Sequence, residues 1–259
     1  MKDLIKCKSP FSAWLDRKQP LPNRFLEKDF VDTVPKRGDN WDCFLALEEC
    51  WPLYRANDLK WESLKESIED TKIFLQNAAT GISGLEGGWL DSEEKIMIES
   101  NVECKPPKQC LPIYIMTIKN AVEERVVYIG KTSSNNRFSN GHTAALKLHN
   151  PKYKAYDKKL YRCSVWFFLQ EEYACLEWLK PENIAYEVLD SIESHLIWCA
   201  QPELNTDKMK QNQSKWNFFI HIQNFTNESP LLNNVFAAGI KNSIKQPSNR
   251  QEHSNSTIY

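Results

Sequence analysis

The sequence lacks the features of a membrane, secreted or zinc-binding protein. No stretch approaches the ~20 consecutive apolar residues of a membrane span, and residues 1–19 contain no apolar signal core. We therefore expect a cytoplasmic protein without membrane contact. The eight cysteines form no CxxC pair, and no two histidines are closely spaced. This pattern predicts reduced, mostly buried thiols, with a zinc site at Cys104 and Cys110 as the alternative.

The net charge of −1 for the whole chain says little about its binding partners, but its segments differ strongly in charge. Residues 1–104 carry 14 Lys+Arg against 20 Asp+Glu, and residues 163–205 carry 1 against 8. By contrast, residues 105–162 carry 12 against 3, a net charge of +9, and residues 206–259 carry 6 against 3. Positive charge concentrated in one segment favours contact with a phosphate backbone, although a lysine-rich stretch can also be a solvated face.

Residues 1–105 predict a mainly helical N-terminal extension. Its first 39 residues show little periodicity, which indicates an irregular arm. The pattern then predicts helices around Phe44–Trp51, over Leu64–Leu75 and over Ser92–Glu99. No helix-turn-helix or zinc-finger motif occurs in this part. The extension could recognise a target, form a dimer surface or support the rest of the chain.

Two short apolar runs, Leu111–Ile118 and Val126–Ile129, each carry one tyrosine and are separated by a polar stretch. Because both are rich in Ile, Val and Tyr, they predict a β-hairpin that places Tyr114 and Tyr128 on neighbouring strands. Gly130 is expected where the chain turns sharply after the second strand. A tyrosine in such a strand is ordinarily a packed aromatic, so its meaning depends on the residues downstream.

The hairpin is followed by Lys131, a polar loop with Arg137, and the expected start of a helix at His142. An arginine near a helix start places a planar donor beside free backbone N–H groups, which suits a phosphate. His142 could serve chemistry or only cap the helix. Several lysines follow, some interleaved with tyrosines, and could contact nucleic acid or form an exposed loop. They are Lys147, Lys152, Lys154, Lys158 and Lys159.

The segment Glu182–Ala200 predicts a helix with an apolar stripe, and Glu193 lies inside that stripe. A buried carboxylate is costly unless something pairs with it. We therefore expect a metal ion, Arg137 or a lysine beside Glu193, either as part of a functional site or as a structural salt bridge. Asn205 lies twelve residues further on, after a proline, where a turn residue is expected.

The remaining elements are less informative about function. Cys163–Leu169 predicts a buried strand, and Trp216–Ile222 is apolar enough for a further strand or helix packed on the domain. Residues 241–259 are rich in Asn, Ser, Gln and Lys, which predicts a disordered tail.

The ordered set of residues from the hairpin to Asn205 resembles the GIY-YIG nuclease family, with Pro-Ile-Tyr and Tyr-Ile-Gly as its two strand motifs. The matching residues are Tyr114, Tyr128, Lys131, Arg137, His142, Glu193 and Asn205. The resemblance implies an α+β fold with a small antiparallel three-stranded sheet flanked by helices. It also implies a nuclease domain over residues 106–225, including a C-terminal packing segment.

The resemblance further implies roles in phosphodiester hydrolysis. Tyr114 or Tyr128 would orient and deprotonate the attacking water. This requires positive charge such as Lys131 to lower a tyrosine pKa that is ordinarily ~10. Arg137 would stabilise charge on the phosphoryl oxygens. Glu193 would hold one divalent cation, Mg²⁺, in a mostly hydrated shell.

A compact chain with this domain between unique extensions most resembles the type II restriction endonucleases of the family. We therefore expect a Mg²⁺-dependent endodeoxyribonuclease that acts on double-stranded DNA. Because one site cuts one strand, a homodimer or homotetramer is expected. A repair, structure-specific or mobile-element nuclease is the first alternative. A non-catalytic nucleic-acid-binding protein on the same fold is the second.

Overall fold

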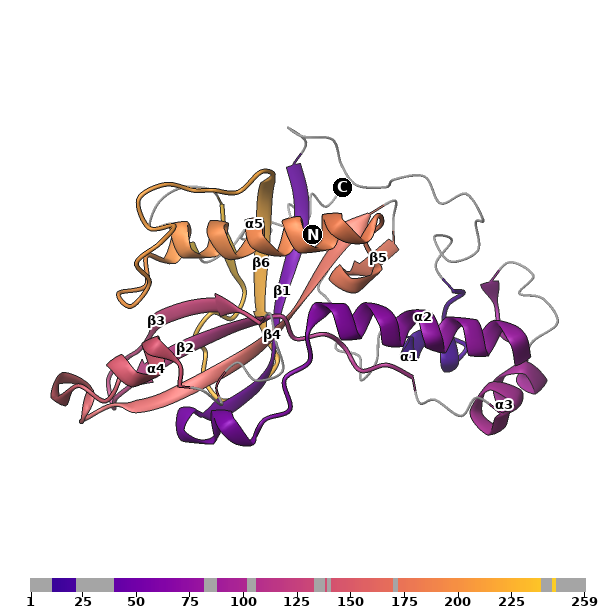
Figure 1. Ribbon diagram of the computed structural model, residues 1–259, viewed down its shortest axis with the longest axis horizontal. Helices are drawn as coiled ribbons and strands as arrows, with labels where there is room; N and C mark the ends of the chain where they lie inside the picture. Colours follow the sequence, from indigo (N-terminus) through magenta and orange to yellow (C-terminus); the bar gives the residue numbers. More distant parts are fainter. Residues whose placement is uncertain are drawn as a thin grey trace, which may run out of the picture.

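The computed structural model describes residues 11–21, 40–81, 88–101, 106–132, 138, 141–169, 172–238 and 244–245. Its centre is a mixed eight-stranded sheet in the order β3-β2-β4-β1-β6-β7-β8, with β5 paired to β4 (Figure 1). The strands are β1 (Asn40–Pro52), β2 (Ile113–Lys119), β3 (Glu124–Lys131), β4 (Asp157–Leu169), β5 (Glu172–Cys175), β6 (Asn217–Asn224), β7 (Val235–Ala237) and β8 (Ile244–Lys245). The α-helices are α1 (Ser12–Leu15), α2 (Leu64–Gly81), α3 (Ser92–Asn101), α4 (Thr143–Lys147) and α5 (Glu182–Ala200). Short 3-10 helices are η2 (Leu53–Asp58), η4 (Pro151–Tyr153) and η5 (Leu176–Trp178). The predicted α+β class is confirmed.

The predicted three-stranded antiparallel sheet is wrong, because the sheet has eight strands and β1 pairs with β6 in parallel. The three strands that the sequence predicts nevertheless lie side by side, with β2 between β3 and β4 and antiparallel to both. The sheet grows beyond them through β1, which pairs with β4. On the edge that does not meet β2, β4 pairs with β1 over nearly its whole length.

The helix predicted around Phe44–Trp51 is wrong, since these residues belong to β1. Five consecutive residues of this strand, Cys43–Leu47, are buried. A central strand that is covered on both faces is apolar at every position and shows no alternation of period two. Its apolar residues can therefore be mistaken for one face of a helix.

The other predicted helices are confirmed as α2, α3, α4 and α5, and the segment after Trp216 forms a strand, β6. The sheet takes β1 from the predicted extension and β2 to β6 from the predicted nuclease domain, so it crosses the boundary expected at residue 105. In the predicted disordered tail, Ile244–Lys245 pair with β7, and residues 241–243 and 246–259 lie outside the described part.

Alternate residues of β2 belong to two different hydrophobic clusters, which shows that both faces of this part of the sheet are covered. Ile113 and Ile115 pack in the cluster that includes α2 and α5. Tyr114 and Met116 pack in a second cluster with Ala144 of α4. The candidate site lies in and beside this second cluster.

The six described cysteines are free thiols, and all but Cys50 are buried, as predicted. Cys7 and Cys104 lie outside the described residues, so the alternative zinc site is not described. Within the described ranges, no helix has the length and apolar character needed to cross a membrane.

Candidate active site

Tyr114 and Tyr128 stack on one face of the β2-β3 hairpin. Tyr114 is paired across the strands with Gly130, and Tyr128 with Met116. The two tyrosines are therefore diagonal neighbours, and their ring centroids lie 6.0 Å apart at an interplanar angle of 27°. Tyr114 is fully buried, whereas Tyr128 is partly exposed and lines a cavity. Of the two, Tyr128 is the one placed to meet a ligand.

Gly130 leaves the space that the tyrosine pair occupies. A Cβ atom at this position would lie 2.5 Å from Oη of Tyr114 and 2.8 Å from Cε1 of Tyr128. The strand continues through Gly130 to Lys131, so the sharp turn expected at this glycine is wrong. The glycine is needed because the two rings pass directly over the backbone.

His142 joins the hairpin to α4. Its Nε2 lies 2.8 Å from Oη of Tyr114, and its Nδ1 accepts the N–H of Ala145 at 3.4 Å as the N-cap of α4. An Nδ1 that accepts a hydrogen bond places the proton of a neutral imidazole on Nε2. His142 then donates to the oxygen of Tyr114. Capping and chemistry are thus not exclusive roles of this residue.

Two aromatic residues complete the packing around Tyr114. Trp61, from the N-terminal part of the chain, lies 5.7 Å from Tyr114 between ring centroids and stacks on Phe138 at 4.9 Å. Phe138 in turn stacks on His142 at 4.8 Å. Trp61 is buried, and no sequence signal ties it to the tyrosine pair.

Asn205 forms hydrogen bonds with the outer edge of β3, next to Tyr128. Its Oδ1 accepts the N–H of Ile129 at 3.0 Å, and its Nδ2 donates to the carbonyl of Ile129 at 2.8 Å. The preceding residue, Leu204, donates its N–H to the carbonyl of Val127. The chain after α5 is thereby fastened to the strand that carries Tyr128, so Asn205 acts as a positioning residue.

Glu193 of α5 is paired with a lysine, one of the partners expected from the sequence. Its side chain is 13% exposed, and its Oε2 accepts from Nζ of Lys208 at 2.6 Å. Lys208 lies three residues after Asn205 and is not among the residues predicted for the site. The predicted need of Glu193 for a cation was the only signal that could have pointed to it.

Asp190 extends this pair into a chain of alternating charges. It forms an ion pair with Lys131, and its Oδ1 lies 3.7 Å from Nζ of Lys208. Burial opposes the charged form of Asp190, but the hydrogen bond and charge of Lys131, with those of Lys208, lower its pKa below the usual range. Lys131 is thus turned toward Asp190 of α5.

Some of these residues line one cavity of about 520 Å³. Five of its lining residues are residues predicted for the site or for nucleic-acid contact: Tyr128, His142, Lys147, Glu193 and Asn205. Asp207 and Lys208 line it as well. Residues from a strand, two helices and the segment after α5, up to 80 positions apart, therefore meet at one concave site.

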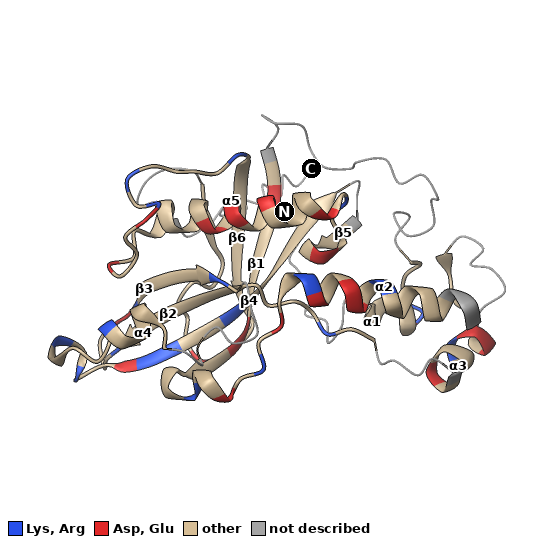
Figure 2. Ribbon diagram, viewed as in Figure 1, with Lys and Arg blue, Asp and Glu red and all other residues tan. Residues whose placement is uncertain are grey.

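The remaining predicted residues do not line this cavity or lie outside the described part of the chain. Arg137 lies outside the described residues. Lys158 and Lys159 line a neighbouring cavity, and Lys152 and Lys154 are exposed between α4 and β4. Figure 2 shows basic residues along β4 and near the β2-β3 hairpin, whereas α3 and α5 carry mainly acidic residues.

Mg²⁺ is the cation expected at Glu193, so the residues around this carboxylate must be able to hold it. The described residues contain no group of three or more His, Cys, Asp or Glu side chains that could hold a metal ion. Mg²⁺, however, is commonly bound by one or two carboxylates and several waters, together with substrate phosphates. A single carboxylate in a polar cavity of this size fits that mode. On binding Mg²⁺, the Glu193 carboxylate would either keep its ion pair with Lys208 or give up that ion pair.

The comparisons with known proteins give no relative for this chain. No model of a protein family, no curated protein and no solved structure shows a significant match. A function for this protein therefore rests on the residues of the candidate active site.

Proposed function

We propose that this protein is a Mg²⁺-dependent endodeoxyribonuclease that hydrolyses phosphodiester bonds of double-stranded DNA as a type II site-specific enzyme. The observation that carries the proposal is the convergence of Tyr128, His142, Glu193 and Asn205 on one cavity. All four belong to the set of residues by which the sequence resembles the GIY-YIG family. A set of incidental matches would have no reason to meet in space.

In this proposal, Tyr128 orients the attacking water, because it is the tyrosine that lines the cavity. Tyr114 and His142 stand behind it, and the hydrogen bond between them fixes both rings. Asn205 holds the edge of the strand that carries Tyr128. Mg²⁺, when bound at Glu193, supplies positive charge at the phosphate and the leaving oxygen.

Positive charge from the chain itself assists the phosphate. Lys147 lines the cavity from α4, and Lys208 lines it as the partner of Glu193. Both ammonium groups would attract an anionic backbone. One such site cuts one strand, so cleavage of both strands at a specific sequence is assigned to a homodimer or homotetramer with two-fold symmetry.

The proposal is tested by incubating the purified protein with phage and plasmid DNA in the presence of Mg²⁺ or a chelator. The wild type is expected to give discrete fragments only with Mg²⁺, and Glu193→Gln is expected to give none. Glu187→Gln is the matched control, because Glu187 lies on the same helix and also pairs with a lysine, Lys215, at 2.8 Å. Absence of cleavage by the wild type, or equal cleavage by both variants, would contradict the proposal.

A further inference from the structure

A second cavity, of about 850 Å³, adjoins the first. It lies between η2, α4 and the start of β4, and it shares Gly141 and His142 with the candidate active site. A group bound there would therefore contact His142, which also borders the proposed phosphate position. Because the cavities share two lining residues, a phosphate in the first and a base in the second could belong to neighbouring parts of one DNA strand.

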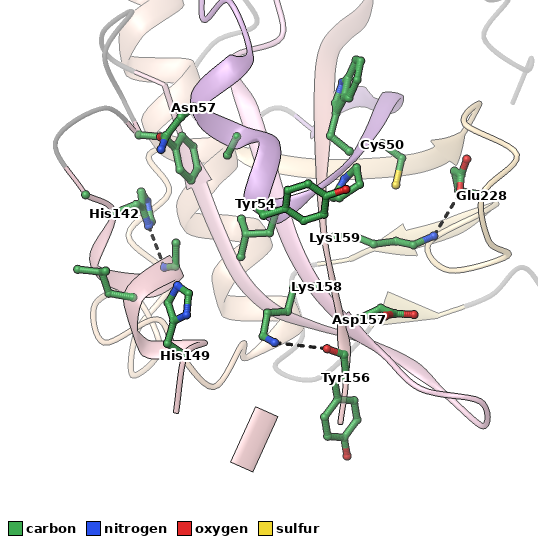
Figure 3. Close-up of a pocket in the computed structure, with 18 residues that line it drawn as sticks. Cys50, Tyr54, Asn57, His142, His149, Tyr156, Asp157, Lys158, Lys159 and Glu228 are labelled. Carbon is green, nitrogen blue, oxygen red and sulfur yellow. Dashed lines mark hydrogen bonds and ion pairs between the residues drawn. The ribbon is translucent and has the colours of Figure 1, made fainter. Parts of the chain in front are cut away.

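Aromatic side chains line this second cavity. Tyr54 of η2 is 84% exposed, which is unusual for a large aromatic residue at the border of a cavity. Tyr156 and His149 also line it (Figure 3). Exposed aromatic rings at the border of a cavity are suited to stacking against a planar group, and every nucleic-acid base offers such a face.

Polar and charged groups complete the lining. Asn57 lies near His142, and its amide carries both donors and acceptors, as the edge of a base does (Figure 3). At the far end, Lys159 pairs with Glu228 at 3.2 Å, so the negative charge of that carboxylate is balanced. Lys158 lies between the two ends and donates to the carbonyl of Tyr156 at 3.4 Å. An ammonium among aromatic rings is the combination found where single nucleic-acid strands bind.

We propose that this cavity binds one unpaired nucleotide of the DNA next to the bond that is cut. The volume falls in the range of sites for small ligands, and the stacking faces and polar groups are useful only to a base that has left its duplex. The occupant is therefore an extruded or displaced base and not a paired duplex. The inference rests on the proposed function, because the adjoining phosphate is assigned to the first cavity.

The test is a binding measurement in chelator, where no metal-dependent cleavage occurs. Two duplexes of equal length share the same strand, which carries one fluorescent purine analogue. In the first duplex the analogue is paired, and in the second it is unpaired. The wild type is expected to bind the second DNA roughly five- to tenfold more tightly and to quench its fluorescence. Tyr54→Ala is expected to remove most of this difference. Tyr186→Ala, which changes a 41% exposed tyrosine on α5, is expected to leave it unchanged.

The outcomes separate this inference from the proposed nuclease activity. Equal binding of the two DNAs by the wild type, or equal behaviour of Tyr54→Ala and Tyr186→Ala, would overturn the nucleotide site even if the protein cleaves DNA. Tyr54-dependent binding without any cleavage in Mg²⁺ would overturn the proposed function and keep the nucleotide site.

Discussion

Nζ of Lys208 lies 2.6 Å from Oε2 of Glu193, so the carboxylate proposed to bind a divalent cation is already paired with a cation of the chain. The two side chains are only 18% and 13% exposed. Removing one partner of such a pair leaves a largely buried charge without compensation. In the proposed nuclease, the Glu193 carboxylate would therefore have to leave Lys208, or contact Lys208 and the metal ion at once, in order to bind metal.

Lys208→Met is expected to lower the free energy of unfolding by about 1–3 kcal/mol at neutral pH, because Glu193 loses its partner. Mg²⁺ should then restore part of this loss, since binding to the folded state stabilises it. The measurement is urea denaturation with and without Mg²⁺. In the double variant with Glu193→Gln, Mg²⁺ should have no such effect. Equal stabilisation of both variants by Mg²⁺ would contradict a metal site at Glu193.

His142→Asn separates the two roles of His142. Asparagine is among the best N-cap residues, so α4 should keep its cap. Loss of the buried imidazole, which stacks on Phe138 and hydrogen-bonds Tyr114, should still lower the free energy of unfolding by about 1–3 kcal/mol. The hydrogen bond to Tyr114 is lost, so DNA cleavage is expected to fall by at least roughly tenfold. The measurements are thermal unfolding and the rate of plasmid cleavage. Tyr186→Phe, which changes an exposed tyrosine on α5, is the control, and a fully active His142→Asn variant would contradict the assigned role.

Gly130→Ala tests the packing of the tyrosine pair. The added Cβ would come within 2.5 Å of Oη of Tyr114, whose ring is fully buried and cannot move aside. Overpacking of this kind costs about 1–3 kcal/mol, so the urea midpoint should fall, and cleavage should fall with it. A variant as stable and as active as the wild type would show that the tyrosines do not stack over this glycine.

Glu177 makes the stability of the fold depend on pH. Burial raises the pKa of this carboxyl group from 4.5 to about 7, against the opposing effect of hydrogen bonds from its own backbone N–H and from that of Cys110. Because the folded state holds the proton to higher pH than the unfolded state, stability should fall as the pH rises from about 4.5 to about 7.

Glu177→Gln should remove this fall, since glutamine keeps an oxygen that accepts from Cys110 and carries no charge. The variant should be more stable than the wild type by about 2–3 kcal/mol at pH ~8 and nearly equal to it at pH ~4.5, as measured by urea denaturation. The surface substitution Glu187→Gln serves as the control. A gain in stability that is the same at both pH values would rule out Glu177 as its source.

The sequence predicted the elements whose signals are local. The hairpin carrying Tyr114 and Tyr128 shows β-branched residues around a polar turn, and α5 shows an uninterrupted helical stripe around Glu193. Both formed as expected. Tyr128, His142, Glu193 and Asn205 are distant in the sequence and line one cavity, and their role in catalysis stays a prediction.

Sequence patterns missed a strand that is buried on both faces and contacts between residues far apart in the chain. The apolar run Cys43–Leu47 is covered on both faces, so its spacing concealed a strand and with it the larger sheet. Trp61 reaches Tyr114 from more than 50 positions away, and no pattern marks such a contact. Lys208 lies outside the motifs and was only implied by the charge of Glu193.

The most direct test of the proposed active site is the single-turnover rate of plasmid cleavage in Mg²⁺ by wild type, Tyr128→Phe and Tyr186→Phe. Tyr128 lines the cavity and Tyr186 is an exposed tyrosine on α5. The proposal predicts efficient cleavage by the wild type and by Tyr186→Phe, and a rate at least roughly a hundredfold lower for Tyr128→Phe. A wild type that cleaves no DNA, or a Tyr128→Phe variant that cleaves as fast as the wild type, would contradict it.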